Sequence, residues 1–210
     1  MSQNLTIGTR ASPLALWQAA HVQKILESKL SIQSKIKKIT TKGATILDRS
    51  LVDVGGKGLF LKEIEEALLT GEIDIAVHSM KDVPHTLEHG LTIAAILERE
   101  DPSDAFVSRK YSSISAMPKD SIVGTSSLRR MVQLKELCPK LKYEVLRGNV
   151  DTRIKKLEAG QYDAIILASA GLIRLGLSHE IKERLPILPG VGQGAMGIEC
   201  CASNRTMIDI

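Results

Sequence analysis

The fold is decided by two similar stretches, Ile7-Gly8-Thr9-Arg10-Ala11-Ser12-Pro13 and Val123-Gly124-Thr125-Ser126-Ser127. Each begins as a short apolar strand, continues through glycine, and opens a helix at small hydroxyl residues. Serine at the N-cap and proline at the first helical position are typical helix starts. A second pair of similar stretches, 69–74 and 158–163, precedes a strand in each half of the chain. This repeat predicts two similar domains.

Strand and helix signals alternate outward from these stretches. Strands are predicted at 5–9, 31–39, 73–77, 91–97, 122–124, 143–146 and 162–167, and helices from 13 onward and over 61–69, 127–137 and 150–157. The alternation predicts an α/β fold, in which ligands bind outside the carboxyl ends of the strands. A charged turn at 98–102 and a glycine-rich segment at 188–194 are candidate domain boundaries, so we expect a cleft between two domains.

Composition narrows the class of protein. The chain has 210 residues, 43% of them hydrophobic and 25% charged, which is typical of a globular protein. No apolar run reaches the roughly 20 residues that span a bilayer, and the N-terminus lacks the plan of a secretory signal, so we expect a cytoplasmic protein. Cys138, Cys200 and Cys201 form no CxxC motif and the five histidines are scattered, so we expect no metal site.

The basic charge balance bears on the partner. A net charge of +4 is compatible with nucleic acid, a membrane surface or a small acidic ligand. Aromatic residues make up only 3% of the chain, which leaves few stacking platforms for single-stranded nucleic acid. Several arginines lie in glycine- and serine-rich turns, where a guanidinium can hold a carboxylate through two hydrogen bonds. The distribution favours a pocket for small carboxylates, with no nucleic acid or membrane as partner.

Three strand-to-helix junctions carry arginine beside a hydroxyl or amide side chain: Thr9–Ser12, Thr125–Arg130 and Arg147–Arg153. Free N–H groups and the helix dipole make such a helix start an anion site. Arg129 and Arg130 lie in a first helical turn, where the dipole disfavours cations, and this choice indicates an anionic partner. The alternative is a pair of exposed arginines on a solvated turn, and ordinary capping explains each junction taken singly.

Polar residues also follow the predicted buried strand that ends near Val77. Lys81 and Asp82 form either a surface ion pair or a site in which Asp82 faces the cleft and stabilises a developing cation, and the pattern leaves both open. His78 lies within the apolar strand pattern and is interpreted as a buried core histidine. The glycine-rich loop around Lys57 lacks the spacing of a P-loop and is interpreted as a mobile lid over the cleft.

Taken together, these stretches resemble the porphobilinogen deaminases across nearly the whole chain. The resemblance rests on Arg10-Ala11-Ser12-Pro13-Leu14-Ala15-Leu16-Trp17-Gln18, Gly55 to Phe60, Ala76 to Pro84, Arg99 to Pro102, Gly124 to Arg130, Leu146 to Asn149 and Val191 to Ala195. It implies two domains with the fold of periplasmic binding proteins and a cleft between them, 1–98 with 195–210 and 99–194. It also implies a third domain, bearing a cofactor cysteine in a Gly-Gly-Cys setting, that has no match in this chain.

The resemblance further implies an activity. Members of the family are transferases of tetrapyrrole and haem biosynthesis, which condense four porphobilinogen molecules head to tail with loss of ammonia and release hydroxymethylbilane. Their cofactor is a dipyrromethane, held through a thioether to cysteine, and they are monomers. Every pyrrole bears acetate and propionate groups, which would explain the arginine clusters. Without the third domain, this chain is expected to bind pyrroles poorly or not to turn over.

By the same resemblance, Asp82 is the catalytic carboxylate, which hydrogen-bonds pyrrole N–H groups and stabilises the cationic azafulvene left when ammonia departs. Carboxylates of cofactor and substrate would be held by Arg10, Ser12, Lys81, Thr125, Ser127, Arg129, Arg130, Arg147, Arg153 and Arg174. Other residues in the matching motifs near the cleft are Gln18, Lys57, Ser79, Gly148, Asn149 and Gln193. The competing hypothesis is a two-domain binding protein for a small polycarboxylate. Asp82 discriminates between the two, because a pure carboxylate binder gains nothing from another negative charge.

Overall fold

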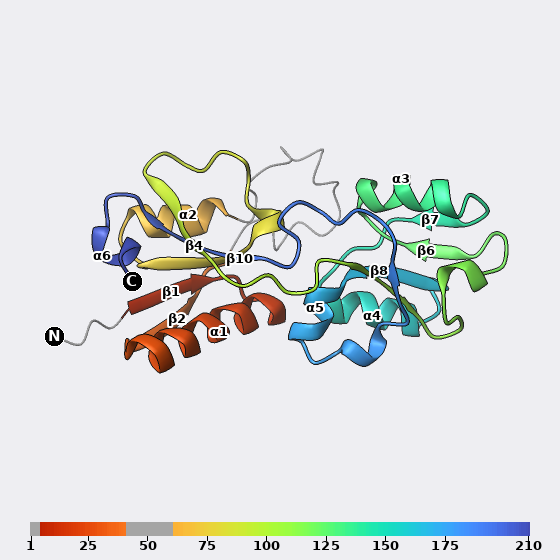
Figure 1. Cartoon of the computed structure of the whole chain (residues 1–210), viewed down its shortest axis with the longest axis horizontal. Coiled ribbons are helices and arrows are strands. Elements are labelled where there is room, and N and C mark those ends of the chain that lie inside the picture. Colours follow the sequence, from red (N-terminus) through yellow and green to blue (C-terminus); the bar gives the residue numbers. More distant parts are fainter. Residues whose placement is uncertain (1–4, 41–60) are drawn as a thin grey trace. The chain divides into compact units, whose positions relative to one another are not determined.

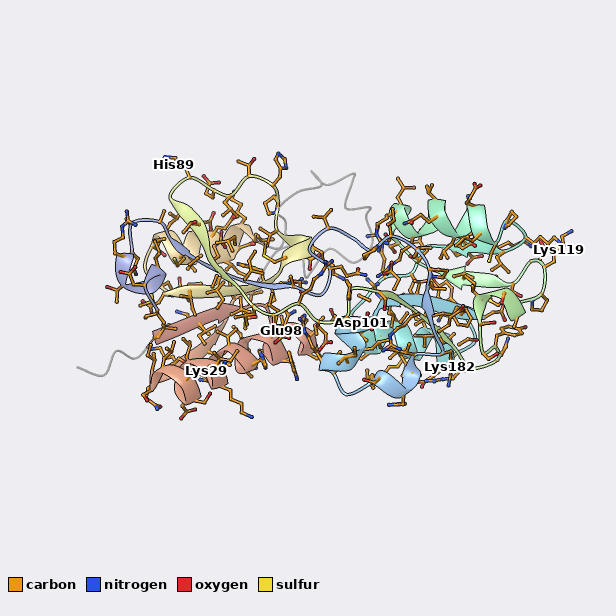
Figure 2. The ribbon with its side chains drawn as sticks, in the orientation of Figure 1. Lys29, His89, Glu98, Asp101, Lys119 and Lys182 are labelled. Carbon is orange, nitrogen blue, oxygen red and sulfur yellow. The ribbon has the colours of Figure 1, made fainter. Side chains whose placement is uncertain are left out.

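The computed structural model describes residues 5–40 and 61–210, which divide into two compact units. One unit contains the chain up to Arg99 together with Ala195–Ile210, and the other contains Glu100–Gly194. The chain therefore passes twice between the units, and Figure 2 labels Glu98 and Asp101 on either side of the first passage. The sequence placed these passages at 98/99 and 194/195.

The first unit is a five-stranded sheet in the order β2-β1-β3-β10-β4. Its strands are β1 (Leu5–Thr9), β2 (Ser34–Lys38), β3 (Ile75–Ser79), β4 (Leu91–Ile96) and β10 (Met196–Cys201). β1 pairs in parallel with β2 and β3, whereas β10 runs antiparallel between β3 and β4. Figure 1 shows α1 (Pro13–Leu30) on one face of the sheet and α2 (Lys62–Leu69) on the other. A short 3-10 turn, η2 (Met80–Asp82), follows β3, and α6 (Arg205–Ile208) follows β10.

The second unit repeats this plan in the order β7-β6-β8-β5-β9. Its strands are β5 (Asp104–Ser108), β6 (Ile122–Gly124), β7 (Lys142–Glu144), β8 (Ala164–Ala168) and β9 (Glu183–Leu185). β6 pairs in parallel with β7 and β8, and β5 runs antiparallel to β8 and β9. Figure 1 shows α3 (Leu128–Leu137) on one face and α4 (Val150–Glu158) with α5 (Ser169–Arg174) on the other. Two short turns, η3 (Ile114–Ala116) and η4 (Ser178–Glu180), complete the unit.

The sequence repeat corresponds to one structural device used twice. In each unit an aspartate that precedes β3 or β8 accepts a hydrogen bond from a backbone N–H near the start of β1 or β6. Thr6 N–H donates to Asp74 at 2.7 Å, and Ile122 N–H donates to Asp163 at 2.9 Å. The glycine that ends the preceding helix is left-handed both times, Gly71 at φ 71° and Gly160 at φ 72°. The repeat therefore fixes how each strand enters its sheet.

Several predicted boundaries differ from the structure. β4, predicted over 91–97, ends at Ile96, which is exposed at the edge of the sheet. β7 is shorter than predicted and ends at Glu144. The sequence analysis missed β5, β9 and β10, because the first carries a charged residue at its start and the other two carry charges within a short run. The predicted mobile loop at 52–58 lies outside the described residues.

Candidate functional site

A small pocket of about 80 Å³ opens in the first unit, where β3 ends and α1 begins. The local sequence explains its walls. Ser12 caps α1 by accepting a hydrogen bond from Ala15 N–H at 3.4 Å, which sets the turn that follows β1. Gln18, one turn into α1 and buried, donates from Nε2 to Ser79 Oγ at 2.9 Å and so ties the helix to the end of β3. The lining residues are Arg10, Ser12, Leu14, Ala15, Gln18, Leu61, Val77, His78, Ser79 and Asp82.

Opposite charges meet in this pocket. Burial lowers the pKa of Arg10, and the negative charge of Asp82 acts in the opposite direction, so the two groups lie within electrostatic reach of one another. Asp82 is exposed, as is its neighbour Lys81 in the same turn. A guanidinium can hold a carboxylate, while a carboxylate can accept a pyrrole-type N–H or stabilise a positive charge. The pocket therefore offers both functions within one small space.

The second unit has a buried carboxylate at the start of α3. Asp104, fully buried, accepts hydrogen bonds from Arg129 Nη1 at 2.7 Å and Arg130 Nε at 2.8 Å. Arg130 is also buried and donates to the Ile166 carbonyl at 2.9 Å. Burial alone would raise the pKa of Asp104, but the hydrogen bonds and charge of the arginines, together with Gln193, hold it below its usual range. The anionic partner indicated by two arginines in a first helical turn is thus, in this structure, the chain's own Asp104.

One positive charge remains at this helix start. Two arginines and one aspartate give a net charge of +1, and the Arg129 side chain is 28% exposed. Ser127 caps α3 by accepting a hydrogen bond from Arg130 N–H, and buried Thr125 accepts one from Ser127 N–H at 3.2 Å. This arrangement leaves a partly exposed guanidinium beside a helix N-terminus, which is a favourable place for a carboxylate.

The segment that leaves the second unit is attached to the same group. Gln193, buried, donates from Nε2 to Asp104 Oδ1 at 2.9 Å and to the Pro102 carbonyl at 2.7 Å. Arg129 Nη1 also donates to the Leu188 carbonyl. Within the second unit, hydrogen bonds of this group therefore hold both segments that connect the units, the one at Pro102 and the one at Leu188–Gln193.

The remaining predicted residues of the second unit lie at two further junctions. Gly148, after β7, has φ 112°, and a Cβ there would come within 2.7 Å of Thr152. Arg153 Nε donates to its carbonyl at 2.7 Å, Asn149 caps α4 without a side-chain bond, and the Arg147 carbonyl accepts from Lys156 Nζ. Arg174, at the end of α5, is buried and donates to the Gly194 carbonyl at 2.6 Å, and burial lowers its pKa.

The structure thus brings the predicted residues into separate groups. Arg10, Ser12, Gln18, Ser79 and Asp82 line the pocket, with Lys81 beside Asp82 but not among the lining residues. In a second group, Arg129, Arg130 and Gln193 bind Asp104, and Thr125 and Ser127 lie at the start of the same helix, α3. Lys57 lies outside the described residues. Sequence analysis missed Asp104, because a charged residue at the head of the short apolar run Ala105-Phe106-Val107 is typical of a loop unless a distant residue pairs with it.

Comparison with known proteins shows the family of the chain. The family model described as porphobilinogen deaminase, dipyromethane cofactor binding domain, matches residues 5–209. The chain belongs to the porphobilinogen deaminase family. It is 54% identical to a porphobilinogen deaminase from Albidiferax ferrireducens over 98% of the chain, and 52% identical to one from Vesicomyosocius okutanii over all of it. It spans 66% and 70% of the lengths of these two relatives.

Solved structures show the fold alone. A periplasmic substrate-binding protein of an ABC transporter from Coxiella burnetii has a TM-score of 0.61 at 11% identity, covering 98% of this chain and 89% of that one. A nutrient-binding protein from Burkholderia cenocepacia, solved with methionine, has a TM-score of 0.61 at 15% identity, covering 98% and 88%. The α/β fold of the periplasmic binding proteins, expected from the sequence, is confirmed. Within residues 5–40 and 61–210, no helix is long and apolar enough to cross a membrane.

The cofactor of the family is a dipyrromethane, and the described residues fit such a group. The partly exposed guanidinium of Arg129 beside α3 is of the kind that holds a carboxylate, and the carboxylate of Asp82 can accept a pyrrole N–H. The three cysteines have no sign of an activated thiol. Burial raises the pKa of Cys138 and of Cys200, which is fully buried, while Cys201 Sγ donates to the Leu68 carbonyl.

Proposed function

We propose that this chain forms the substrate- and cofactor-holding part of a hydroxymethylbilane synthase, which condenses four porphobilinogen molecules head to tail with loss of ammonia. The observation that carries the proposal is the pocket in which Asp82 lies within electrostatic reach of the partly buried Arg10. A substrate that bears carboxylates and passes through a cationic state needs both charges. Bound dipyrromethane supplies the primer to which pyrroles are added, attached to a cysteine that the three of this chain do not match.

In this proposal each residue of the first unit has a separate task. Arg10 and Ser12 hold a substrate carboxylate, and Gln18, through Ser79, keeps the end of β3 against α1. Asp82 accepts the pyrrole N–H and stabilises the positive charge that develops as the amine leaves as ammonia. Fixed charges placed where charge develops are a large source of rate acceleration. Lys81, in the same turn, would contact the carboxylate side of the substrate.

In the second unit, Arg129 and the start of α3 would bind carboxylates of the cofactor. Arg130 is buried against Asp104, so in this structure it supports the site through its hydrogen bonds to Asp104 and to the Ile166 carbonyl. Arg147, Arg153 and Arg174 are proposed to bind further carboxylates of the growing chain. The monomeric state, the cytoplasmic location and the lack of a nucleic acid partner stay predictions.

The alternative function is binding of a small polycarboxylate without catalysis. It is separated from the first by Asp82→Asn in the full-length protein, with the exposed Asp120→Asn as a matched control. Loss of the charge should lower kcat by about 10²–10³-fold while the fold and carboxylate binding persist. Turnover within threefold of wild type would refute the mechanism. The intact mass of the full-length protein provides a second test, since a holoenzyme is heavier than its translated sequence by two linked pyrroles.

A further inference from the structure

Because the two sheets have the same topology, residues at equivalent positions in the two cores can be compared. Gly8 in β1 lies opposite Ala76 in β3, and Gly124 in β6 lies opposite Ile165 in β8. β10 crosses β3 antiparallel in the first sheet just as β5 crosses β8 in the second. Each residue of β3, and each residue of β10 up to Cys200, therefore has a counterpart in β8 and β5.

One difference between the two cores, on the face covered by α2, replaces an apolar pair by a polar pair. His78 Nε2 lies 2.9 Å from Glu199 Oε2, and both side chains are buried. By the pairing above, their counterparts are Leu167 and Val107, which pack in an apolar cluster under α4. Burial of a polar pair costs desolvation, and apolar residues of similar volume are often no less stable. Stability alone therefore does not account for His78 and Glu199.

Glu199 is an unusual residue for this position. It is fully buried, and its second oxygen, Oε1, has no hydrogen-bond partner among the residues that the structure describes. Glu65 of α2 faces the pair: burial, then Glu199 and Glu88, raise the pKa of Glu65, while His78 lowers it. The charged groups that surround the His78–Glu199 pair thus come from α2, from the segment before β4, and from β3 and β10 themselves.

The pair coincides with an irregularity in the sheet. Between β10 and β4 the register shifts between Ile198 and Glu199, so that Ile198 faces Ala95 but Glu199 faces Ile93. The counterpart strands β5 and β9 pair without a shift. The pairing of β10 with β3 has no such shift, so β10 is in regular register with only one of its two neighbours. The His78–Glu199 pair lies on that regular side, and buried polar groups that fix register are a well-attested use of such pairs.

The register of β10 decides where the turn after β3 rests. Gly197 lies opposite His78, and a Cβ at Gly197 would come within 2.2 Å of Met80 Sδ. Met80 N–H donates to the Ala195 carbonyl at 3.0 Å, which anchors the same turn to the entry of β10. If β10 slipped by one residue, Met196 or Ile198 would lie beneath Met80, and the Met80 side chain would have to move away from the new side chain.

We propose that Glu199, through its hydrogen bond with His78, is a positioning residue that sets the β10 register so that Gly197 lies beneath Met80 and the η2 turn presents Asp82 to the pocket. The pair joins β3 to β10 directly before this turn. Its role for turnover rests on the function proposed for Asp82, whereas the placement of the turn does not.

The test exchanges the pair for its counterpart from the second sheet, His78→Leu with Glu199→Val, in the full-length protein. We expect a Tm equal to or above that of wild type, because the second unit carries this pair in the same place. The Met80 amide should exchange hydrogen at least about tenfold faster, since its anchor on β10 opens more often. Misplacing Asp82 by about 1 Å should lower kcat by about a hundredfold, with KM changed much less.

Two further variants separate positioning from other roles. Glu199→Gln keeps the volume and a hydrogen bond to His78, so Met80 exchange should stay within about threefold of wild type. Cys200→Ala removes a buried group from the opposite face of β10, and should lower Tm without changing kcat or Met80 exchange.

The proposal would be overturned if the double variant, His78→Leu with Glu199→Val, kept the wild-type kcat and the wild-type hydrogen-exchange rate of the Met80 amide. A fall in the Tm of this double variant would also overturn it, because the pair would then be structural. If the Met80 amide exchanged hydrogen as fast in Glu199→Gln as in the double variant, the charge of Glu199 would be what matters, and not its hydrogen bond. If Asp82→Asn keeps turnover, the proposed function fails, but the exchange measurement on Met80 still decides the positioning role.

Discussion

Replacing Asp104 by asparagine removes the charge that balances Arg130 inside the second unit. Asp104 accepts from Arg129, Arg130 and Gln193, and the Arg130 side chain is 7% exposed, so the guanidinium cannot turn to water. Breaking a buried ion pair by removing one partner typically costs about 3–5 kcal/mol, because the other charge stays buried. The arginine keeps its bond to the Ile166 carbonyl, so we expect a loss near the lower end of that range.

The chain carries probes that assign this loss to one unit. Its one tryptophan, Trp17, lies in the first unit, and its three tyrosines, Tyr111, Tyr143 and Tyr162, all lie in the second. Urea unfolding followed by tryptophan emission and by tyrosine second-derivative absorbance therefore reports each unit separately. Asp104→Asn should move the tyrosine transition to lower urea and leave the tryptophan transition in place.

The matched control is Asp104→Met with Arg130→Met, since Met196 occupies the position of Asp104 in the first sheet. Removing both charges leaves no buried ion unpaired, so the double variant should recover about 1–3 kcal/mol of the loss, the usual coupling of contacting residues. A loss below about 1 kcal/mol in the single variant would contradict the buried-pair reasoning. So would a shift in the tryptophan transition alone.

Three further predictions concern the repeated frame. Gly124→Ala places a Cβ 2.8 Å from the Tyr162 ring, and overpacking should cost about 1–3 kcal/mol in the tyrosine transition. Ser12→Ala removes the cap of α1 and should lower the stability reported by tryptophan by about 1 kcal/mol, whereas Ser12→Asn should not. A hydrogen bond from Lys110 lowers the pKa of Asp163. The contribution of ionised Asp163 to the free energy of unfolding is therefore complete above the usual aspartate pKa, near pH 4, and is lost as the pH falls through the lowered pKa. The tyrosine Tm should therefore fall on acidification below about pH 4, and less so in Asp163→Asn; equal falls would refute this linkage.

Sequence analysis could predict the features that are local. The start of α1 at Ser12 and Pro13, the glycine stop of α2 and the two Asp-containing repeats depend on residues a few positions apart. β10 and β5 could not be predicted in this way, because their charged residues are satisfied from distant parts of the chain. Asp104 is bonded by Arg129, and Glu199 by His78. Without those contacts, a charge in a short apolar run is typical of a loop.

The same distinction, between local sequence features and contacts with distant residues, applies to the candidate site. Two arginines at a helix start indicate a nearby anion from electrostatics alone, and the sequence analysis reached that point. The anion in the structure is Asp104, and an external carboxylate would have to use the exposed part of Arg129. The need for negative charge is a local property, whereas the residue that supplies it depends on the path of β5.

The pairing of His78 with Glu199 illustrates why even a recognised repeat is incomplete in sequence. The offset that takes Asp74 to Asp163 also takes His78 to Leu167, so the exchange of a polar for an apolar residue on the third parallel strand was present in the sequence. Glu199 has no such signal, because its strand ends the first unit while the counterpart strand, β5, begins the second. The two halves are not collinear at this strand. The counterpart of Glu199 is therefore defined by pairing across the sheet, and only a structure shows that the first unit has a buried hydrogen-bonded pair where the second has an apolar contact.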